Sequence, residues 1–163
     1  LGELINYNAY GETLDDLHIS PESLFQALHS FTEPFEFIQS SGELKQLREG
    51  FRSDMRKAQE KKAFRQSSVG RIFQFPNAPW SRRVSGVFSN QLARESPELA
   101  HALLVERTDG TFLVSVRAPI TRPYGADKLC LKFSGGGRVA AAGINKLAQE
   151  DVDRFFAAFE KQF

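Results

Sequence analysis

The chain has 163 residues, of which 41% are hydrophobic, so it can bury a core as one domain or as a small domain with an appended element. Its formal net charge of +1 excludes a strong overall field toward nucleic acid or membranes, so any anion site must be local. Cys130 is the only cysteine, which excludes a disulfide framework and a thiolate zinc cluster and fits a reducing cytoplasm.

The chain begins at Leu1 rather than at a methionine, and its first residues look like part of a continuing structural element. We therefore expect a piece of a longer protein. No segment is long and apolar enough to span a bilayer, and no signal peptide is visible. We therefore expect a cytoplasmic location and no membrane partner.

Residues 1–67 are expected to be mainly helical, starting with a short helix or strand over residues 4–11. Ser20–Glu22 supply a capping hydroxyl, a first-turn proline and an acid, which predict a helix that ends near His29 or Ser30. The longest predicted helix follows, because apolar residues recur at helical steps. These residues are Leu44, Leu47, Phe51, Met55 and Ala58.

Two charged groups in this region have two interpretations each. Asp15, Asp16 and His18 are of the types that bind divalent cations, but a local group without partners from other elements is typical of a solvated surface.

The long helix carries a basic face that can follow phosphates. Its cations are Arg48, Arg52, Arg56, Lys57, Lys61, Lys62 and Arg65. Acidic residues lie between them, which favours a solvated face.

From Gly70 onward the pattern becomes mixed α/β. Residues 71–75 alternate in polarity and predict a strand that stops at Pro76. Ser81 is expected to cap a helix. The apolar positions of that helix are Val84, Val87, Phe88, Leu92 and Ala93. Ser96–Glu98 predict a further helical turn.

Thr108–Gly110 form the strongest turn signal and predict a β-hairpin with strands over residues 101–107 and 111–117. Alternate residues of the second strand share a face. One face has Phe112, Val114 and Val116, which should pack on helices, and the other has Leu113, Ser115 and Arg117.

The C-terminal part predicts a short helix over residues 126–133, a small-residue strand over residues 139–144 and a last helix that packs through an aromatic stripe. The inward residues are Leu129, Cys130 and Phe133 of the short helix and Val152, Phe155, Phe156, Phe159 and Phe163 of the last one. We therefore expect an α/β domain over residues 68–163, with a mixed β-sheet flanked by helices, preceded by a helical connector over residues 1–67.

A glycine-rich segment, residues 134–143, is the strongest candidate for a binding site. Gly135–Gly137 can adopt left-handed conformations and direct successive N–H groups at an anion, and Arg138 adds a charge. The small residues that follow would let a base or ribose approach the main chain. A flexible loop before a strand is the alternative. The G-x-G-x-x-A spacing also fits a dinucleotide fingerprint, but the preceding helix and the short remaining chain argue against a Rossmann site.

Residues 135–143, Gly-Gly-Gly-Arg-Val-Ala-Ala-Ala-Gly, resemble the Gly-Gly-Gly-His-x-x-Ala-Ala-Gly signature of the C-terminal, DHH-associated domain of DHH-superfamily phosphoesterases. That superfamily includes RecJ exonucleases, nanoRNase/pAp phosphatases and cyclic-dinucleotide phosphodiesterases. The resemblance implies that this segment binds the phosphate or nucleotide of a substrate. Arg138 stands where the signature has histidine, so a role in phosphate binding carries over and a role in proton transfer does not.

The same resemblance implies the rest of the site. Ser115-x-Arg117 is similar to a Ser-x-Arg element whose arginine contacts substrate phosphate, whereas a solvent-exposed strand end is the alternative for Arg117. The expected substrate-binding residues are Asn90, Ser115, Arg117, Gly135, Gly136, Gly137, Arg138, Ala142 and Gly143. No catalytic residue and no metal ligand is expected in this chain.

The resemblance places the chemistry in another domain, where two metal ions are held by aspartates and histidines that include an Asp-His-His motif. This chain lacks that motif, and its histidines are His18, His29 and His101. We therefore expect a chain that is inactive alone and lacks both the catalytic domain and its manganese or magnesium. Its partners would be that domain and a nucleotide or short single-stranded nucleic acid, and a homodimer is one option.

Two functions follow. One is the substrate-binding domain of a metal-dependent phosphoesterase or exonuclease that acts on short oligonucleotides or small nucleotides. The alternative is a stand-alone, non-catalytic module that binds nucleotides or single-stranded nucleic acid. A complete enzyme is disfavoured, because no nucleophile-elbow motif accompanies Cys130 or any serine.

Overall fold

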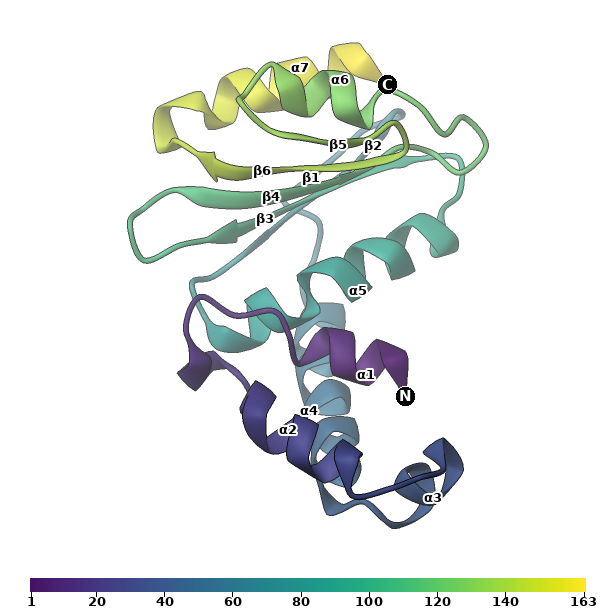
Figure 1. The fold of residues 1–163 in the computed structure, drawn as a ribbon. Helices are drawn as coiled ribbons and strands as arrows, with labels where there is room; N and C mark the ends of the chain where they lie inside the picture. The colour runs from purple at the N-terminus through teal and green to yellow at the C-terminus, as the bar shows by residue number, and fades with distance from the viewer. The chain divides into compact units, whose positions relative to one another are not determined.

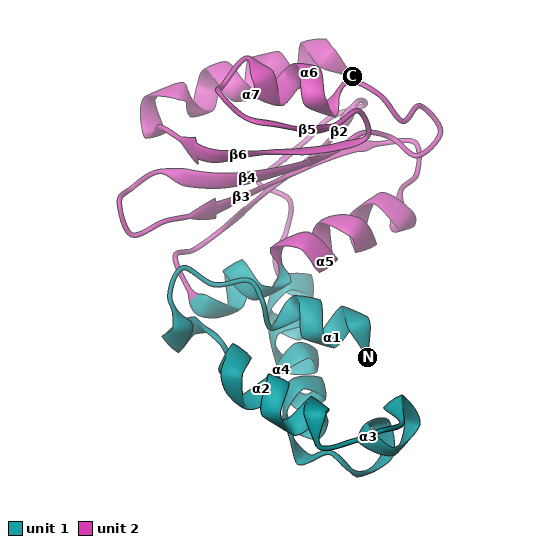
Figure 2. Cartoon of the chain, in the orientation of Figure 1, with its two compact units in different colours: residues 1–60, 79–84 teal, residues 61–78, 85–163 magenta.

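The computed structural model describes residues 1–163, which fold into two compact units (Figure 2). Unit 1 comprises Leu1–Glu60 and Pro79–Val84, and unit 2 comprises Lys61–Ala78 and Ser85–Phe163. Helix α5 (Pro79–Glu95) therefore contributes its first residues to unit 1 and the remainder to unit 2. None of the helices has the length and apolar character needed to cross a membrane.

Unit 1 is helical (Figure 1). Its elements are α1 (Gly2–Tyr7), the 3-10 helix η1 (Leu14–Asp16), α2 (Pro21–His29), α3 (Pro34–Ser40) and α4 (Gly42–Gln59). Helix α2 begins and ends where predicted, and the Ser20 hydroxyl accepts a hydrogen bond from the Ser23 N–H (3.1 Å). Ser41 caps α4 in the same way. The sequence pattern does not predict α3 as a helix.

The predicted apolar stripe of α4 is confirmed, because four of its five residues are buried and Phe51 is half-buried. The buried residues are Leu44, Leu47, Met55 and Ala58. Leu44 and Leu47 pack in one cluster with Leu24 of α2 and Phe37 of α3. Each such side chain contributes about 1.5–3 kcal/mol by leaving water.

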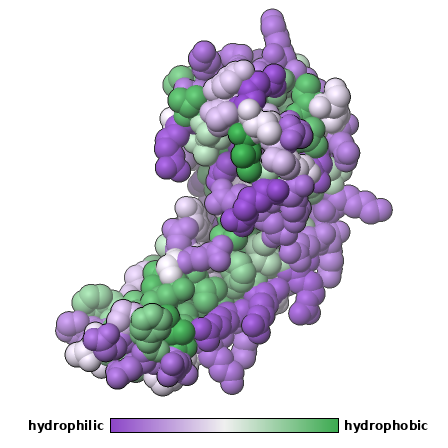
Figure 3. Space-filling model, turned by 90° about the vertical axis from the view of Figure 1, so that its right-hand side faces the viewer, coloured by the Kyte–Doolittle hydropathy of each residue, from purple (hydrophilic) through white to green (hydrophobic).

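Apolar side chains also gather on one surface of unit 1, which Figure 3 shows in green. The most exposed apolar residues of unit 1 include Leu14, Phe25 and Phe35. The ring of Phe25 stacks on His29, with centroids 5.5 Å apart and an interplanar angle of 10°. His29 is exposed.

A buried polar network joins α1, α4 and α5 within unit 1. Asp54 of α4 is 2% exposed and accepts hydrogen bonds from Tyr7 Oη (2.5 Å) and Arg83 Nε (2.8 Å). His18 Nε2 lies 2.7 Å from Tyr7 Oη. Burial alone would raise the pKa of Asp54, but the hydrogen bonds from Tyr7 and Arg83 outweigh it and hold that pKa below its ordinary value. The network therefore joins side chains from parts of the chain that are far apart in the sequence.

The Asp15, Asp16 and His18 group does not converge on one point. Arg82 binds Asp16 through Nε and Nη2, which lie 2.7 and 2.8 Å from the two carboxylate oxygens, and this lowers the pKa of Asp16 to about 2. His18 is engaged by Tyr7 instead. No group of three or more His, Cys, Asp or Glu side chains in the chain is arranged to hold a metal ion.

The strands of unit 2 form one six-stranded sheet in the order β1-β2-β3-β4-β6-β5. They are β1 (Arg65–Gln66), β2 (Gly70–Phe75), β3 (Ala100–Glu106), β4 (Phe112–Arg117), β5 (Gly136–Arg138) and β6 (Ala141–Leu147). Strands β2 and β3 are parallel and α5 connects them, whereas all other neighbours are antiparallel. The α/β class with a mixed sheet is confirmed, and so is the β3–β4 hairpin.

Helices cover both faces of this sheet (Figure 1). Helices α6 (Ala126–Leu131) and α7 (Val152–Gln162), with the 3-10 helix η2 (Gln149–Asp151) before α7, lie on one face. The part of α5 in unit 2 lies on the other face, where Phe88 contacts Phe73 of β2 edge-to-face at 5.5 Å.

The main core of unit 2 lies between the sheet and helices α6 and α7. The alternation predicted for β4 is confirmed, because Phe112, Val114 and Val116 are buried in this core. The aromatic stripe of α7 is confirmed as well, and Phe155 and Phe159 are fully buried. Leu113, Ser115 and Arg117, on the opposite face of β4, are half-buried.

Two predicted helix starts are wrong. Helix α5 begins at Pro79, with Ala78 as its N-cap, because proline suits the first helical turn, and Ser81 is a buried residue inside the helix. Ser96–Glu98 form only a turn, closed by a hydrogen bond from Leu99 N–H to Ser96 O (3.1 Å), because strand β3 starts directly afterwards.

Candidate functional site

The two arginines predicted to bind phosphate lie in one row across three neighbouring strands. Arg117 of β4 pairs with Ala141 of β6, and Ala141 pairs with Arg138 of β5. Directly opposed residues of antiparallel strands point to the same face of a sheet. Both arginines therefore project from the face opposite to α6 and α7, and Ala141 is the paired residue between them.

A second row of the same face carries almost no side-chain atoms. Ser115 of β4 pairs with Gly143 of β6, which pairs with Gly136 of β5. A Cβ atom added to Gly136 would meet no atom within 4 Å, so the space above this glycine is open. A flat or charged ligand can therefore approach the main chain beside the arginines.

The glycine run does not form the anion nest or loop that its sequence suggests. Gly136 and Gly137 belong to strand β5, and of the three consecutive glycines only Gly137 has a positive φ, 144°. The N–H of Gly135 donates to the carbonyl of Cys130 (2.9 Å). A nest needs successive N–H groups that point at one spot, and strand geometry alternates them. An anion here would be held by arginine side chains.

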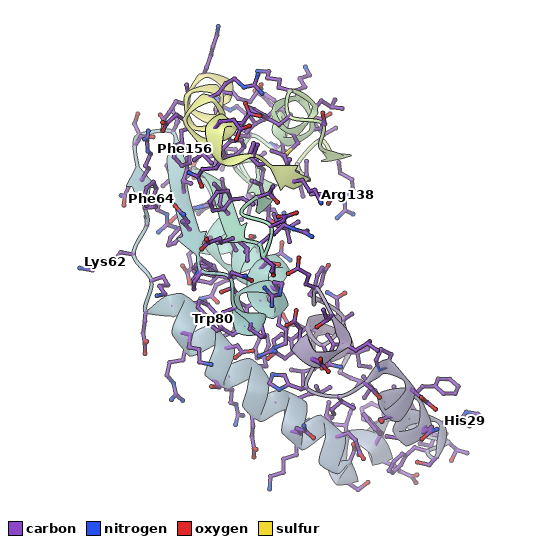
Figure 4. The ribbon with its side chains drawn as sticks, turned by 90° about the vertical axis from the view of Figure 1, so that its left-hand side faces the viewer. His29, Lys62, Phe64, Trp80, Arg138 and Phe156 are labelled. Atoms are coloured by element: carbon purple, nitrogen blue, oxygen red, sulfur yellow. The ribbon has the colours of Figure 1, made fainter.

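Arg117 is oriented by two hydrogen bonds. Its Nε donates to Oδ1 of Asn90 on α5 (2.8 Å), and its Nη1 donates to the carbonyl of Val116 (3.1 Å). The side chain is half-buried, so less conformational freedom is lost when it binds an anion. Arg138 is exposed and projects from the edge of the sheet (Figure 4).

A cleft of about 350 Å³ opens beside Arg117. Its polar lining comes from Asn90, Arg94 and Arg117. The remaining lining is small or apolar and consists of Ala93, Ala118, Pro119, Ile120, Pro123, Ala140 and Ala141. Arg94 follows Asn90 by one helical turn on α5, so the two side chains share a face. The sequence analysis does not identify Arg94, the third polar residue of the cleft. The only sequence signal for it is its position four residues after Asn90.

Three predicted residues lie elsewhere. Ala142 is buried in the core on the side of α6 and α7, and Gly137 is its partner on β5. A Cβ atom on Gly137 would lie 2.6 Å from the Cα of Ala142, and one on Gly135 would lie 2.3 Å from the carbonyl oxygen of Gly143. These small residues let β5 approach β6 closely, so their place in the structure is to shape the backbone.

Two buried titratable groups of unit 2 are neutral at physiological pH. His101 of β3 is paired with Arg117 in the sheet, and burial, aided by the charge of Arg71, lowers its pKa to about 4. Burial, aided by Asp127, raises the pKa of the Cys130 thiol to about 12. The thiol is therefore no nucleophile at neutral pH, and the local positive charge comes from arginines.

No family model and no curated protein matches this sequence. A solved structure, the pGpG-specific phosphodiesterase PggH from Vibrio cholerae, is similar in fold, with a TM-score of 0.61 and 18% sequence identity. The similarity covers 89% of this chain and 53% of that one, so the chain spans about half the length of that protein. At this identity the likeness shows the α/β fold.

Proposed function

We propose that unit 2 binds the phosphate groups of a nucleotide or short oligonucleotide that a phosphoesterase hydrolyses. The observation that carries the proposal is Arg117, held by Asn90 at 2.8 Å on the cleft and aligned with Arg138 across β6. A planar guanidinium of fixed orientation suits two parallel N–H···O bonds to phosphate. The alanines and prolines of the cleft leave room for a ribose or base.

Two likenesses support this class of ligand. The segment of residues 135–143 resembles the DHH-associated substrate-binding domain, and the fold is similar to that of a phosphodiesterase named for the linear dinucleotide pGpG. We infer that 5′-phosphorylated dinucleotides and short oligonucleotides are the first ligands to test. Arg138, in place of the signature histidine, would add a second cation at the phosphate.

The hydrolysis itself would belong to a further domain that holds manganese or magnesium and activates water. The residues of this chain do not fit such a centre, because Arg82 engages Asp16 and Tyr7 engages His18. The proposal therefore includes no hydrolytic step by residues of this chain. Its part in the proposal is to bind the substrate and orient its phosphate.

A stand-alone binding module would use the same cleft, and a purified-protein assay separates the two functions. The isolated chain, incubated with manganese and a short oligonucleotide, should release no mononucleotide under either function. A DHH-type catalytic domain should release mononucleotide faster in the presence of this chain than alone only if unit 2 presents substrate to it. Metal-dependent turnover by the isolated chain would contradict both.

A thermal-shift screen tests the binding site. The ligands are mononucleotides, a 3′,5′-bisphosphate, pGpG and other linear dinucleotides, cyclic dinucleotides and nucleosides without phosphate. A ligand present at 100 times its Kd stabilises the folded state by about 2.7 kcal/mol. We expect at least one phosphorylated ligand to raise the melting temperature of the parent and not of Arg117→Gln. Equal shifts in both proteins, or no shift with any phosphorylated ligand, would contradict the proposal.

A further inference from the structure

A second surface of unit 2 has an exposed aromatic residue. Phe64 lies directly before β1 and its side chain is 57% exposed. Its N–H donates to the carbonyl of Ile72 (2.8 Å), which fixes the residue against β2. Its ring lies next to Phe156 of α7, with centroids 5.9 Å apart and an interplanar angle of 39°. A single exposed aromatic needs no functional explanation, but two further features accompany this one.

The first feature is a hollow of about 320 Å³ beside the ring. Its apolar wall includes Phe64 and Phe156, and its polar lining includes Gln74 and Gln149. The guanidinium of Arg65 lies over the Phe156 ring, 4.3 Å from its centroid. A flat π-face next to amide donors and acceptors is the environment that a nucleobase requires, because a base has an apolar face and a polar edge.

The second feature is local positive charge. Lys61 and Lys62 are exposed and directly precede this segment, and Arg65 follows Phe64. Figure 4 shows Lys62 extending outward on the side of unit 2 where Phe64 and Phe156 lie. Two acids adjoin these cations: Asp153, 91% exposed and 3.4 Å from Arg65 Nη2, and the exposed Glu60, which directly precedes Lys61. The segment therefore has cations on both sides of one stacking residue.

We propose that this Phe64 surface, formed by Lys61, Lys62, Phe64 and Arg65, binds single-stranded nucleic acid. One base stacks on Phe64 and occupies the hollow, and the lysines contact the backbone phosphates. Strand β1 lies at the opposite end of the sheet from β5, so this surface is separate from the Arg117 cleft. The inference is independent of the proposed function, since neither site needs the other to bind.

Fluorescence anisotropy with a labelled single-stranded oligonucleotide of about ten nucleotides tests the proposal, because this length is within the range of common single-stranded binding sites. Phe64→Leu should weaken binding roughly tenfold, through loss of stacking, and Phe64→Tyr should retain it. Lys61→Gln and Lys62→Gln should each reduce the slope of log K against log salt by about 0.7. Asp153→Asn should tighten binding, because it removes an opposing charge and releases Arg65.

The matched controls are Leu131→Ala and Lys132→Gln, which change an exposed apolar residue and an exposed lysine at the end of α6. Neither should alter the affinity. The Phe64→Leu loss should also appear in an Arg117→Gln background, and Phe64→Leu should leave the thermal shift of a mononucleotide unchanged. These two results distinguish failure of the Phe64 surface from failure of the cleft.

Unchanged oligonucleotide binding by Phe64→Leu would overturn the proposal. So would equal affinity for a duplex of the same length, because the interior bases of a duplex already stack on one another and are not available to Phe64. Vesicles that contain phosphatidylserine provide the last comparison. If Phe64→Leu weakens binding to vesicles but not to the oligonucleotide, the surface is a membrane contact and the inference is wrong.

Discussion

Replacement of His101 by glutamine should make unit 2 more resistant to acid. His101 is 1% exposed, its Nε2 lies 3.3 Å from the carbonyl of Ser96, and its Nδ1 has no hydrogen-bond partner. Register places it between Arg71 and Arg117. Burial lowers its pKa to about 4 and outweighs the opposing hydrogen bond of Ser96, whereas the charges of Arg71, which lowers the pKa, and Glu95, which raises it, have smaller effects. Folding therefore disfavours the protonated ring.

The size of the effect follows from linkage between protonation and folding. A histidine with an ordinary pKa of 6.5 takes up a proton in the unfolded chain first, so stability is lost as pH falls from 6.5 and the loss is complete below about 4. At about 1.4 kcal/mol per pH unit, this interval corresponds to about 3 kcal/mol. Glutamine cannot gain the proton, and its amide can still donate to the Ser96 carbonyl.

Urea denaturation of the parent and of His101→Gln, followed by circular dichroism between about pH 7.5 and pH 4, measures the effect. The difference in unfolding free energy between the variant and the parent should be constant above about pH 7. As the pH falls to 4, it should change by about 3 kcal/mol in favour of the variant. A difference that stays constant over the whole range would refute the reasoning, because His101 would then titrate alike in both states.

Three further changes test the packing. Phe159→Ala should lower the unfolding free energy of unit 2 by about 3–5 kcal/mol, since its ring is fully buried, and an unchanged urea midpoint would contradict this. Arg83→Met should cost unit 1 about 3 kcal/mol, again read from urea denaturation, because it removes the closest cation of the buried Asp54 (2.8 Å) and leaves Lys57 at 3.5 Å. Gly137→Ala should lower the melting temperature, because of its φ of 144°, whereas Gly136→Ala should not; equal melting curves would argue against strand β5.

Elements with local signals could be predicted from the sequence. The turn at residues 108–110, the Ser20 cap and the aromatic spacing of α7 each depend on residues a few positions apart, and the structure confirms all three. The predicted start of α5 at Ser81 is wrong because Pro79 and Ser81 both suit the start of a helix, and the helix begins at Pro79. Only burial of Ser81, which depends on tertiary packing, decides between them.

Strand β5 could not be predicted, because glycine has low strand propensity and only pairing with β6 makes the run extended. The candidate site shows the same limit. Asn90 and Arg117 are expected site residues, yet the hydrogen bond between them spans 27 positions and no sequence pattern predicts it. Arg94 joins the cleft for the same reason, since the position of α5 on the sheet brings it there.

Calorimetric titration of the best phosphorylated ligand is the most direct test of the phosphate site. The account predicts that Arg117→Ala and Arg138→Ala each weaken binding about ten- to hundredfold, as expected for loss of a charge-assisted hydrogen bond, and that Arg117→Lys recovers only part. Arg52→Ala, on the exposed basic face of α4, should bind like the parent. If Arg52→Ala weakens binding while both other alanine variants bind like the parent, the cleft is not the phosphate site and α4 is.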